Sequence, residues 1–325
     1  MTSASPRPAT APLALVAGAS RGLGLAIAHD LGRRGHRLVI CARSAAELQH
    51  AEAALTAEGI SVRTVVCDVA DPAAVETMVQ SVERGDGPIE VAIAVAGVIQ
   101  VGPLASMTRA HFEEAINIML WGPINLALSV VGPMRSRGYG RVGVITSIGG
   151  LVAVPHLLPY STAKFGAVGF SSGLRAELAG TGVKVTTVAP GLMRTGSHLR
   201  AEFTGQQGAE YAWFAPSATL PLIAMRPEAA AAKIVDGILA GRAYVLLSLK
   251  TKIAARVAGL APTTTAAVLG LAARLLPSGP PPTGTDTVQG HTVEDRLGPL
   301  PSAVVRAVTT LGRASARRLN QYPKD

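Results

Sequence analysis

The chain has 325 residues, of which 48% are hydrophobic and 16% are charged, so it can fill a sizeable core and is not intrinsically disordered. Its formal net charge is +9, but the basic residues are scattered and not interleaved with aromatic ones. The charge therefore favours a solvated basic surface over a nucleic-acid interface, and a positive field of this kind suits an anionic cofactor.

Cysteine usage and the N-terminus indicate a reducing compartment. Cys41 and Cys67 each end an apolar run, which predicts two buried thiols. The first twelve residues, MTSASPRPATAP, lack the apolar core of a signal peptide. We therefore expect a cytoplasmic protein whose residues 1–11 are disordered. The seven histidines show no ligand spacing, so no metal is predicted.

Short apolar runs alternate with helix-length segments as far as about residue 249. The runs lack polar–apolar alternation, which is typical of strands covered on both faces. The pattern predicts an α/β fold, a doubly wound parallel sheet of about seven strands with helices on both faces. The predicted strands are Leu13–Ala17, Arg37–Cys41, Val62–Cys67, Val91–Val95, Arg141–Thr146, Val183–Ala189 and Tyr244–Leu249.

A glycine-rich turn, GASRGLG at residues 18–24, follows the first predicted strand and opens a predicted helix over residues 22–34. Gly18 permits the tight turn, Gly22 lets a pyrophosphate approach the backbone, and Gly24 lets the helix pack closely on the strand. The helix N-terminus offers N–H groups and a partial positive charge to phosphates. The predicted cofactor contacts in this turn are Gly18, Ser20, Arg21, Gly22, Leu23 and Gly24.

The end of the second predicted strand indicates which nucleotide fits. An NAD enzyme usually has an acid there, on the ribose hydroxyl. This chain has Cys41-Ala42-Arg43 and no acid. Arg43, together with Arg21, is placed to grip a 2′-phosphate through charge-assisted hydrogen bonds, so the sequence favours NADP(H) over NAD(H).

Tyr160 and Lys164 lie four residues apart at the start of a predicted helix over residues 160–179, so they share one face. A phenol titrates near 10, too high for a base at neutral pH, and a neighbouring ammonium lowers that pKa. Ser147 follows the fifth predicted strand, 13 residues before Tyr160. The pair alone would be uninformative, but its order and spacing relative to Ser147 and the glycine turn are specific.

Together these features resemble the short-chain dehydrogenase/reductase family, over roughly residues 12–249. The matching elements are GASRGLG at 18–24, Asp68 after the third strand, Ser147, YSTAK at 160–164 and PGLMRT at 190–195. The resemblance implies a Rossmann-fold domain, a homodimer or homotetramer, and hydride transfer between NADP(H) and the carbon of an alcohol or ketone.

The resemblance also implies roles for single residues. Tyr160 would be the general acid/base, Lys164 would lower its pKa and bind the nicotinamide ribose, and Ser147 would hold the substrate oxygen. The remaining cofactor contacts would be Asp68 and Val69 beside the adenine, and Gly97, Pro190, Gly191 and Thr195 toward the nicotinamide.

Two departures from the family pattern stand out. Where the family usually has Asn-Asn-Ala-Gly, this chain has Ala-Val-Ala-Gly at 94–97, and apolar packing replaces the missing amides. Many members carry an Asn where this chain has Met119, which we interpret as core-facing; Asn117 lies about 200° round an α-helix from it. Proton resupply then needs another water path, or turnover is slow. A catalytically weak NADP(H)-binding sensor or scaffold is therefore the alternative to an active oxidoreductase.

The segment between Ser147 and Tyr160 is apolar, with His156 as its one ionisable group. Residues 197–225 contain the aromatic residues Tyr211, Trp213 and Phe214 close together and are predicted to close over the substrate. A hydrophobic secondary alcohol or ketone, lipid- or steroid-like, is expected. The predicted substrate contacts are Ser147, His156, Leu157, Met193 and Trp213.

The remaining residues are predicted to form a helical extension over 250–276 and a Pro/Gly-rich linker with a basic tail over 277–325, including one helix near 300–320. Residues 257–273 carry no charge, but the stretch is too short and too interrupted to span a membrane. Lys250, Lys252 and Arg256 permit peripheral binding to an anionic membrane. Cover of the substrate cleft or of a partner subunit is the favoured role.

Overall fold

The computed structural model describes residues 11–220, 224–277 and 285–322, with the backbone alone for residues 299–308. Of the segment 1–11 that was predicted to be disordered, residues 1–10 lie outside the described residues, as do residues 278–284 of the predicted Pro/Gly-rich linker.

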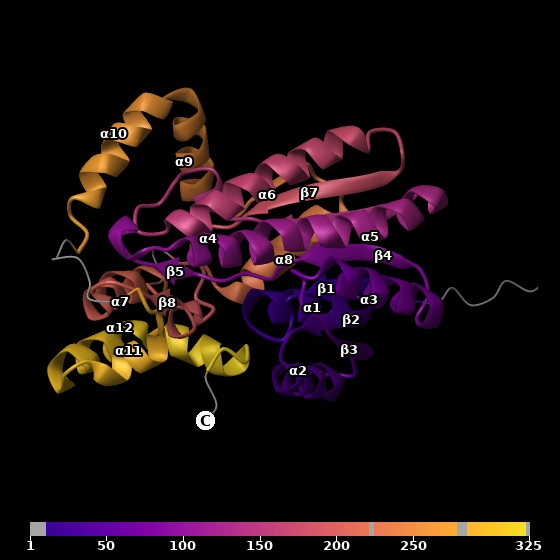
Figure 1. Cartoon of the computed structure of the whole chain (residues 1–325). Coiled ribbons are helices and arrows are strands. Elements are labelled where there is room, and N and C mark those ends of the chain that lie inside the picture. The colour runs from indigo at the N-terminus through magenta and orange to yellow at the C-terminus, as the bar shows by residue number, and fades with distance from the viewer. Residues whose placement is uncertain (1–10, 221–223, 278–284, 323–325) are drawn as a thin grey trace, which may run out of the picture.

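Seven strands form one parallel sheet in the order β3-β2-β1-β4-β6-β7-β9 (Figure 1). This confirms the predicted doubly wound α/β sheet. The strands are β1 (Leu13–Ala17), β2 (Arg37–Ala42), β3 (Val62–Val66), β4 (Ile89–Ala94), β6 (Gly140–Ile145), β7 (Val183–Ala189) and β9 (Tyr244–Leu246). The last strand is shorter than predicted, because the Ser248 hydroxyl accepts a hydrogen bond from Thr251 N–H and so begins a helix at Leu249.

Helices cover both faces of the sheet. Successive residues of a strand point to opposite faces, so Leu15 packs in one apolar core and Val16 in the other. One core involves α3 (Pro72–Gly85), α4 (Arg109–Ile116), α5 (Gly122–Arg137) and α6 (Leu158–Glu177); the other involves α1 (Gly22–Arg33), α2 (Ala45–Ala57) and α8 (Pro227–Leu239). A π-helical turn, Asn117–Trp121, joins α4 to α5. Cys41 and Cys67 are both buried thiols.

The C-terminal residues fold back onto the domain and do not form an extended linker and tail. β10 (Val288–Gln289) joins a small second sheet with β8 (Glu202–Phe203) and β5 (Gln100–Val101). Helices α11 (Gly290–Arg296) and α12 (Pro299–Arg318) pack against α7 (Gln207–Ser217) (Figure 1). The sequence predicted the basic helix but not its packing.

Two further helices extend from the body of the molecule, α9 (Leu249–Leu260) and α10 (Pro262–Ala273) (Figure 1). They meet at an angle of 117°, and α10 has no buried residue. Among the described residues, the helical stretch Arg109–Arg137 is long and apolar enough to cross a membrane, but half of its apolar window is buried inside the protein. Three short 3₁₀ turns complete the described elements: η1 (Leu104–Ser106), η3 (Ile148–Gly150) and η4 (Ser197–Leu199).

The connection from α6 to β7 contains two glycines that allow a matched test of how closely this turn packs against the turn at Gly138. Gly180 and Gly182 both have left-handed backbones, with φ of +81° and +82°. A Cβ at Gly180 would meet no atom within 4 Å, whereas one at Gly182 would lie 1.8 Å from the carbonyl oxygen of Gly138. Only the second position combines backbone strain with a clash against another part of the main chain.

We therefore expect Gly180→Ala to lower the free energy of unfolding by about 1–2 kcal/mol, which is the cost of a left-handed residue with a Cβ. Gly182→Ala should lower it by at least about 2 kcal/mol more, because the Gly138 turn must move. Urea unfolding of both variants checks this. Equal losses would contradict the close packing of the two turns.

Candidate active site

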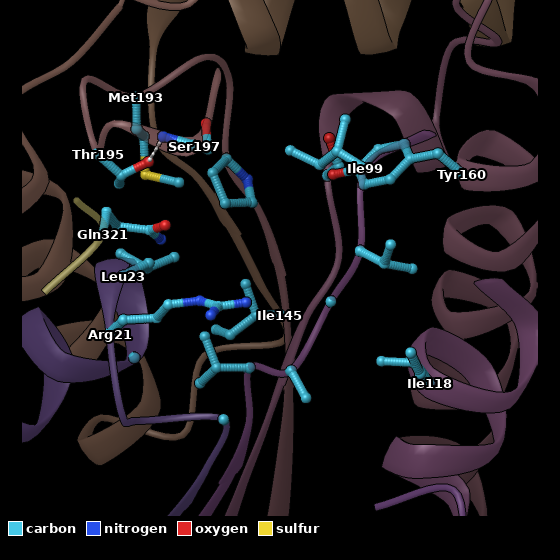
Figure 2. A pocket seen from close by; sticks show the side chains of 18 of the residues that line it. Arg21, Leu23, Ile99, Ile118, Ile145, Tyr160, Met193, Thr195, Ser197 and Gln321 are labelled. Atoms are coloured by element: carbon cyan, nitrogen blue, oxygen red, sulfur yellow. Dashed lines mark hydrogen bonds between the residues drawn. The ribbon is translucent and has the colours of Figure 1, made fainter. Parts of the chain in front are cut away.

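A cleft of about 360 Å³ lies at the carboxyl ends of β1, β4, β6 and β7, where open parallel sheets bind their ligands. It runs from the glycine-rich turn to the start of α6 (Figure 2). Its lining includes Met193 of the predicted substrate contacts and nearly all the residues predicted for cofactor and catalysis: Gly18, Ser20, Arg21, Leu23, Gly24, Arg43, Asp68, Val69, Gly97, Ser147, Tyr160, Lys164, Pro190, Gly191 and Thr195.

Close backbone contacts explain the glycines of the turn. Gly18 has φ of +89°, and a Cβ there would lie 2.4 Å from the backbone nitrogen of Ala96. A Cβ at Gly24 would lie 2.1 Å from the carbonyl oxygen of Gly18. Helix α1 then starts at Gly22 without a side-chain cap; the Gly22 N–H bonds the Leu319 carbonyl, and the N–H groups of Leu23 and Gly24 are left for an anion. These features fit the pyrophosphate of a dinucleotide.

The space in front of Gly22 is not open. A Cβ at Gly22 would lie 2.3 Å from Nε2 of Gln321, and Gln321 also lines the cleft. The sequence analysis missed this residue, because nothing in the local pattern connects the chain end with the turn.

An acid, Glu47, lies in the cleft where none was predicted. It is in the first turn of α2, five residues beyond the end of β2, and was overlooked because an acid was sought at the strand end itself. Its carboxylate accepts hydrogen bonds from Arg21 at 2.6 Å and Ser20 Oγ at 3.0 Å, and Arg200 lies 3.4 Å away. Two guanidinium groups thus share one carboxylate, which leaves this end of the cleft positive.

The loop after β3 provides the wall expected beside the adenine. Asp68 accepts a hydrogen bond from Ala70 N–H at 3.0 Å, and the amide of Asn125 donates to the Val69 carbonyl at 2.9 Å. Both Asp68 and Val69 line the cleft.

Ser147, Tyr160 and Lys164 come together at the other end of the cleft. Ser147 lies two residues beyond the end of β6 and accepts a hydrogen bond from Gly149 N–H at 3.0 Å, and its hydroxyl bonds the Tyr160 phenol. The Lys164 ammonium donates to the Ile145 carbonyl at 2.8 Å and lies 5.8 Å from the centre of the Tyr160 ring. A phenol and a hydroxyl therefore face one point of the cleft, as proton transfer to a substrate oxygen requires.

Two glycines that the sequence analysis did not single out permit this approach. A Cβ at Gly149 would lie 3.1 Å from the Tyr160 ring, and one at Gly150 would lie 2.6 Å from the Lys164 carbonyl oxygen. The short turn η3 can therefore sit directly against the first turns of α6.

Burial controls the protonation of both groups. Burial raises the pKa of Tyr160 above its usual 10, and the hydrogen bond from Ser147 opposes this rise. Burial lowers the pKa of Lys164 from 10.5 to about 8. The expected lowering of the Tyr160 pKa by Lys164 is not found in this arrangement, because the ammonium is directed at the Ile145 carbonyl. Tyr160 is a neutral phenol at pH 7, in the form that donates a proton.

The segment after β7 forms the wall expected beside the nicotinamide. The Pro190 carbonyl accepts a hydrogen bond from Ile148 N–H at 2.8 Å, and Thr195 is buried with its hydroxyl accepting from Ser197 N–H at 3.3 Å (Figure 2). Thr195 thus caps the next turn while it also lines the cleft.

Three predicted substrate contacts, His156, Leu157 and Trp213, are not among the residues that line the cleft. His156 Nδ1 lies 2.8 Å from Glu210, and the Trp213 indole N–H donates to the same carboxylate at 2.7 Å. Glu210 is fully buried and pairs with both. These side chains therefore join α7 to the body of the domain.

The aromatic cluster in residues 197–225 does not form an open lid. Tyr211 and Phe214 pack edge-on against Phe203, and among these three only Phe214 lines the cleft. The substrate side of the cleft is lined by Phe214, which was expected to close over the substrate, and by apolar residues that were not predicted: Val98, Ile99, Ile118, Leu192 and Ala218.

Met119 is fully buried, as interpreted from the sequence, and its Sδ lies 3.4 Å from where a Cβ of Gly97 would be. Asn117 is exposed at the start of the π-helical turn. It therefore does not replace the amide that many family members have at position 119.

Comparison with known proteins agrees with this geometry. Residues 12–204 match the short chain dehydrogenase family, which is more than half of the chain. The chain therefore belongs to the short-chain dehydrogenase/reductase family and is an oxidoreductase by class. The putative ketoacyl reductase 1 of granaticin polyketide synthase from Streptomyces violaceoruber is 35% identical over 206 residues, which cover 62% of this chain and 76% of that protein.

Solved structures share the fold. A short-chain dehydrogenase from Streptomyces avermitilis superimposes with a TM-score of 0.69 at 24% identity, covering 82% of this chain and 99% of that one. A variant of actinorhodin polyketide ketoreductase with NADPH gives a TM-score of 0.64 at 29% identity, covering 73% of this chain and 95% of that one.

The burial of Lys164 predicts that this residue costs stability. Because its pKa falls from 10.5 to about 8 on folding, the unfolded chain binds the proton more tightly. We expect Lys164→Met to raise the free energy of unfolding at pH 7 by roughly 1–3 kcal/mol. The exposed Lys252→Met is the control and should change it by less than about 0.5 kcal/mol.

The stability gained by Lys164→Met should decrease as the pH rises. Between the folded pKa of about 8 and the usual 10.5, the unfolded wild type binds more protons than the folded one, so its stability rises with pH. The difference between wild type and Lys164→Met should therefore shrink across this window. Urea unfolding at pH 7 and pH 10 measures it, and a variant less stable than wild type at pH 7 would contradict the argument.

Proposed function

We propose that this protein is an NADPH-dependent reductase of hydrophobic ketones, which also oxidises the corresponding secondary alcohols in the reverse direction. The observation that carries the proposal is the convergence of Ser147, a protonated Tyr160 and Lys164 at one end of a dinucleotide-shaped cleft. Binding alone does not need a proton donor, so an active enzyme is favoured over a sensor or scaffold.

The residues of the chain supply the proton and the orientation. When bound, NADPH supplies the hydride to the carbonyl carbon. The Ser147 and Tyr160 hydroxyls hold the carbonyl oxygen, and Tyr160 gives it the proton that completes the alcohol. The Lys164 ammonium, 5.8 Å from the centre of the Tyr160 ring, would bind the nicotinamide ribose, as the family resemblance implies. The raised pKa of Tyr160 keeps it protonated at neutral pH, which favours the reductive direction.

NADP(H) is the cofactor. Arg21 and Arg43 line the end of the cleft that would receive a 2′-phosphate. The Glu47 carboxylate is paired with Arg21 and hydrogen-bonded by Ser20, so its negative charge is offset at the end of the cleft that would receive the phosphate. The ketoreductase of similar structure that holds NADPH supports the same choice.

The substrate is proposed to be a hydrophobic secondary alcohol or ketone. Beside Ser147 the cleft is lined by apolar side chains, among them Ile99, Leu192 and Phe214. The similar ketoacyl reductase, as its name states, reduces a ketone on an acyl chain, and the apolar wall is consistent with a chain of that kind. The homo-oligomer implied by the family resemblance stays a prediction.

Substitution of the proton donor tests the enzyme proposal. Tyr160→Phe should lower kcat/KM for NADPH oxidation with a panel of apolar ketones by at least about 100-fold, because general acid catalysis is lost. Its NADPH affinity, measured by fluorescence titration, should change little. Tyr139→Phe removes the same hydroxyl from an exposed tyrosine and should keep the wild-type rate. Equal rates in wild type and Tyr160→Phe would support the sensor or scaffold instead.

We also propose that the protein is cytoplasmic and binds membranes peripherally through residues 249–276, which contain α9 and α10 and which we call the α9–α10 arm. The arm exposes a series of large apolar side chains, with Leu260 at 87% and Leu275 at 85% exposed. The sequence from Leu249 to Leu276 has no acidic residue and four basic ones, at 250, 252, 256 and 274. Apolar surface with a purely basic charge complements an anionic lipid surface.

The arm begins next to the active site. Thr251 Oγ1 would lie 2.8 Å from a Cβ of Gly191, which lines the cleft. An arm inserted in a lipid surface would therefore bring the cleft near a hydrophobic substrate dissolved there.

Vesicle sedimentation of the full chain tests this role. Wild type should sediment with phosphatidylglycerol-containing vesicles, and Leu260→Gln/Leu275→Gln should bind at least about tenfold more weakly, since two buried leucines are lost. Leu104→Gln/Leu128→Gln alters exposed leucines elsewhere on the body and should bind like wild type. Absence of wild-type binding, or equal binding by all three proteins, would exclude the role of the arm.

A further inference from the structure

The end of the chain is bonded to the glycine-rich turn. The Leu319 carbonyl accepts a hydrogen bond from Gly22 N–H at 2.7 Å. The amide of Asn320 donates to the carbonyls of Ser20 at 3.0 Å and Glu47 at 3.2 Å. Asn320 has φ of +53°, a left-handed conformation that asparagine adopts more readily than most residues. Residues 319–321 therefore form a specific turn held at the phosphate-binding corner.

This turn places Gln321 in the cleft. Its side chain extends into the cleft between Arg21 and Thr195 (Figure 2). The backbone carbonyl of Gln321 is held by Arg200 at 3.2 Å, so the position of the residue is fixed from both sides. Gln321 thus comes from the far end of the sequence to the middle of the cleft.

The carboxamide of Gln321 lacks a partner for its oxygen. Gln321 is only 9% exposed, and its Oε1 is a buried atom with no hydrogen-bond partner in the described structure. A buried unpaired amide oxygen is costly, and such groups are usually satisfied by protein, water or ligand. Because Gln321 lines the cleft, a ligand there can satisfy its carboxamide.

We propose that Gln321 is a cofactor-binding residue that holds the central part of NADP(H) against the glycine-rich turn. The carboxamide has two N–H donors and one acceptor. Its N–H suits a pyrophosphate oxygen, and its carbonyl suits an adjacent ribose hydroxyl. Asn320 and Leu319 are positioning residues that hold Gln321 at the turn. This inference rests on the proposed NADP(H)-dependent function and assigns part of the cofactor site to the C-terminal extension.

The opposite role, a chain end that blocks the cofactor, is disfavoured by the shape of the cleft. The cleft stays continuous from Asp68 at one end to Tyr160 at the other, with Gln321 in its wall. The turn also retains the N–H groups of Leu23 and Gly24 at the start of α1, beside the one bonded to Leu319. The end of the chain therefore borders the site and leaves room for a dinucleotide.

Binding of two ligands to the full chain tests the proposal, by calorimetry and nicotinamide fluorescence. Gln321→Ala should raise the Kd for NADPH about tenfold, as expected for one hydrogen bond to a charged group. It should leave the Kd for 2′-AMP within about twofold, because this ligand has the adenosine and 2′-phosphate but no pyrophosphate. Gln321→Glu should weaken NADPH binding further, since a carboxylate would face the pyrophosphate.

A matched control and the thermal midpoint separate binding from folding. Gln80→Ala removes an exposed glutamine from α3 and should bind both ligands like wild type. Unliganded Gln321→Ala should have the wild-type Tm. If wild type binds NADPH but Gln321→Ala binds it equally well, the role of Gln321 is wrong while the function stands. Tighter binding by Gln321→Ala would instead identify a blocking chain end.

Two further results are decisive. An equal loss for NADPH and 2′-AMP would mean that Gln321 acts only through the shape of the turn, which overturns its direct contact with the cofactor. A wild-type protein that does not bind NADPH would overturn the proposed function and this inference together.

Discussion

The active site depends on one close contact at the centre of the sheet, where the turn after β1 meets the chain leaving β4. Strand order reverses direction between these two neighbours, and ligands bind at such a switch point. Gly18 can lie against the backbone of Ala96 because it has no side chain: a Cβ at position 18 would come within 2.4 Å of the backbone nitrogen of Ala96. The start of α1, the cleft and the docking of the chain end at Gly22 all follow from that contact.

The proposed chemistry at the other end of the cleft uses two ionisable side chains, Tyr160 and Lys164, whose charged forms are destabilised by burial. Tyr160 and Lys164 are both buried. Burial raises the pKa of Tyr160 and lowers the pKa of Lys164, so it favours the neutral form of each group. A neutral phenol beside Ser147 is suited to donating a proton, whereas an alcohol oxidation must first remove that proton. The surrounding apolar core, with Met119 in place of a polar amide, supplies the stability that offsets the buried ammonium.

The sheet, the glycine-rich turn and the Ser147–Tyr160–Lys164 set could be predicted because each is encoded in a short stretch with a fixed order. What escaped prediction depends on distant partners. His156 was expected at the substrate because it is the one ionisable group in an apolar stretch, but its partner Glu210 lies 54 residues away. Glu47 and Gln321 reach the cleft by helix and chain-end geometry that no local pattern encodes.

The C-terminal extension links the two ends of the site mechanically. The Tyr211 hydroxyl donates to Glu294 at 2.6 Å, and Arg313 pairs with the same carboxylate, so α7, α11 and α12 share one buried polar group. Helix α7 carries Phe214 of the substrate wall, while α12 leads into the turn at Gln321. Because a buried carboxylate is tolerated only with its partners in place, these helices must keep a fixed arrangement. The positions of Phe214 in the substrate wall and of Gln321 at the glycine-rich turn therefore both depend on the buried Glu294 carboxylate and its partners.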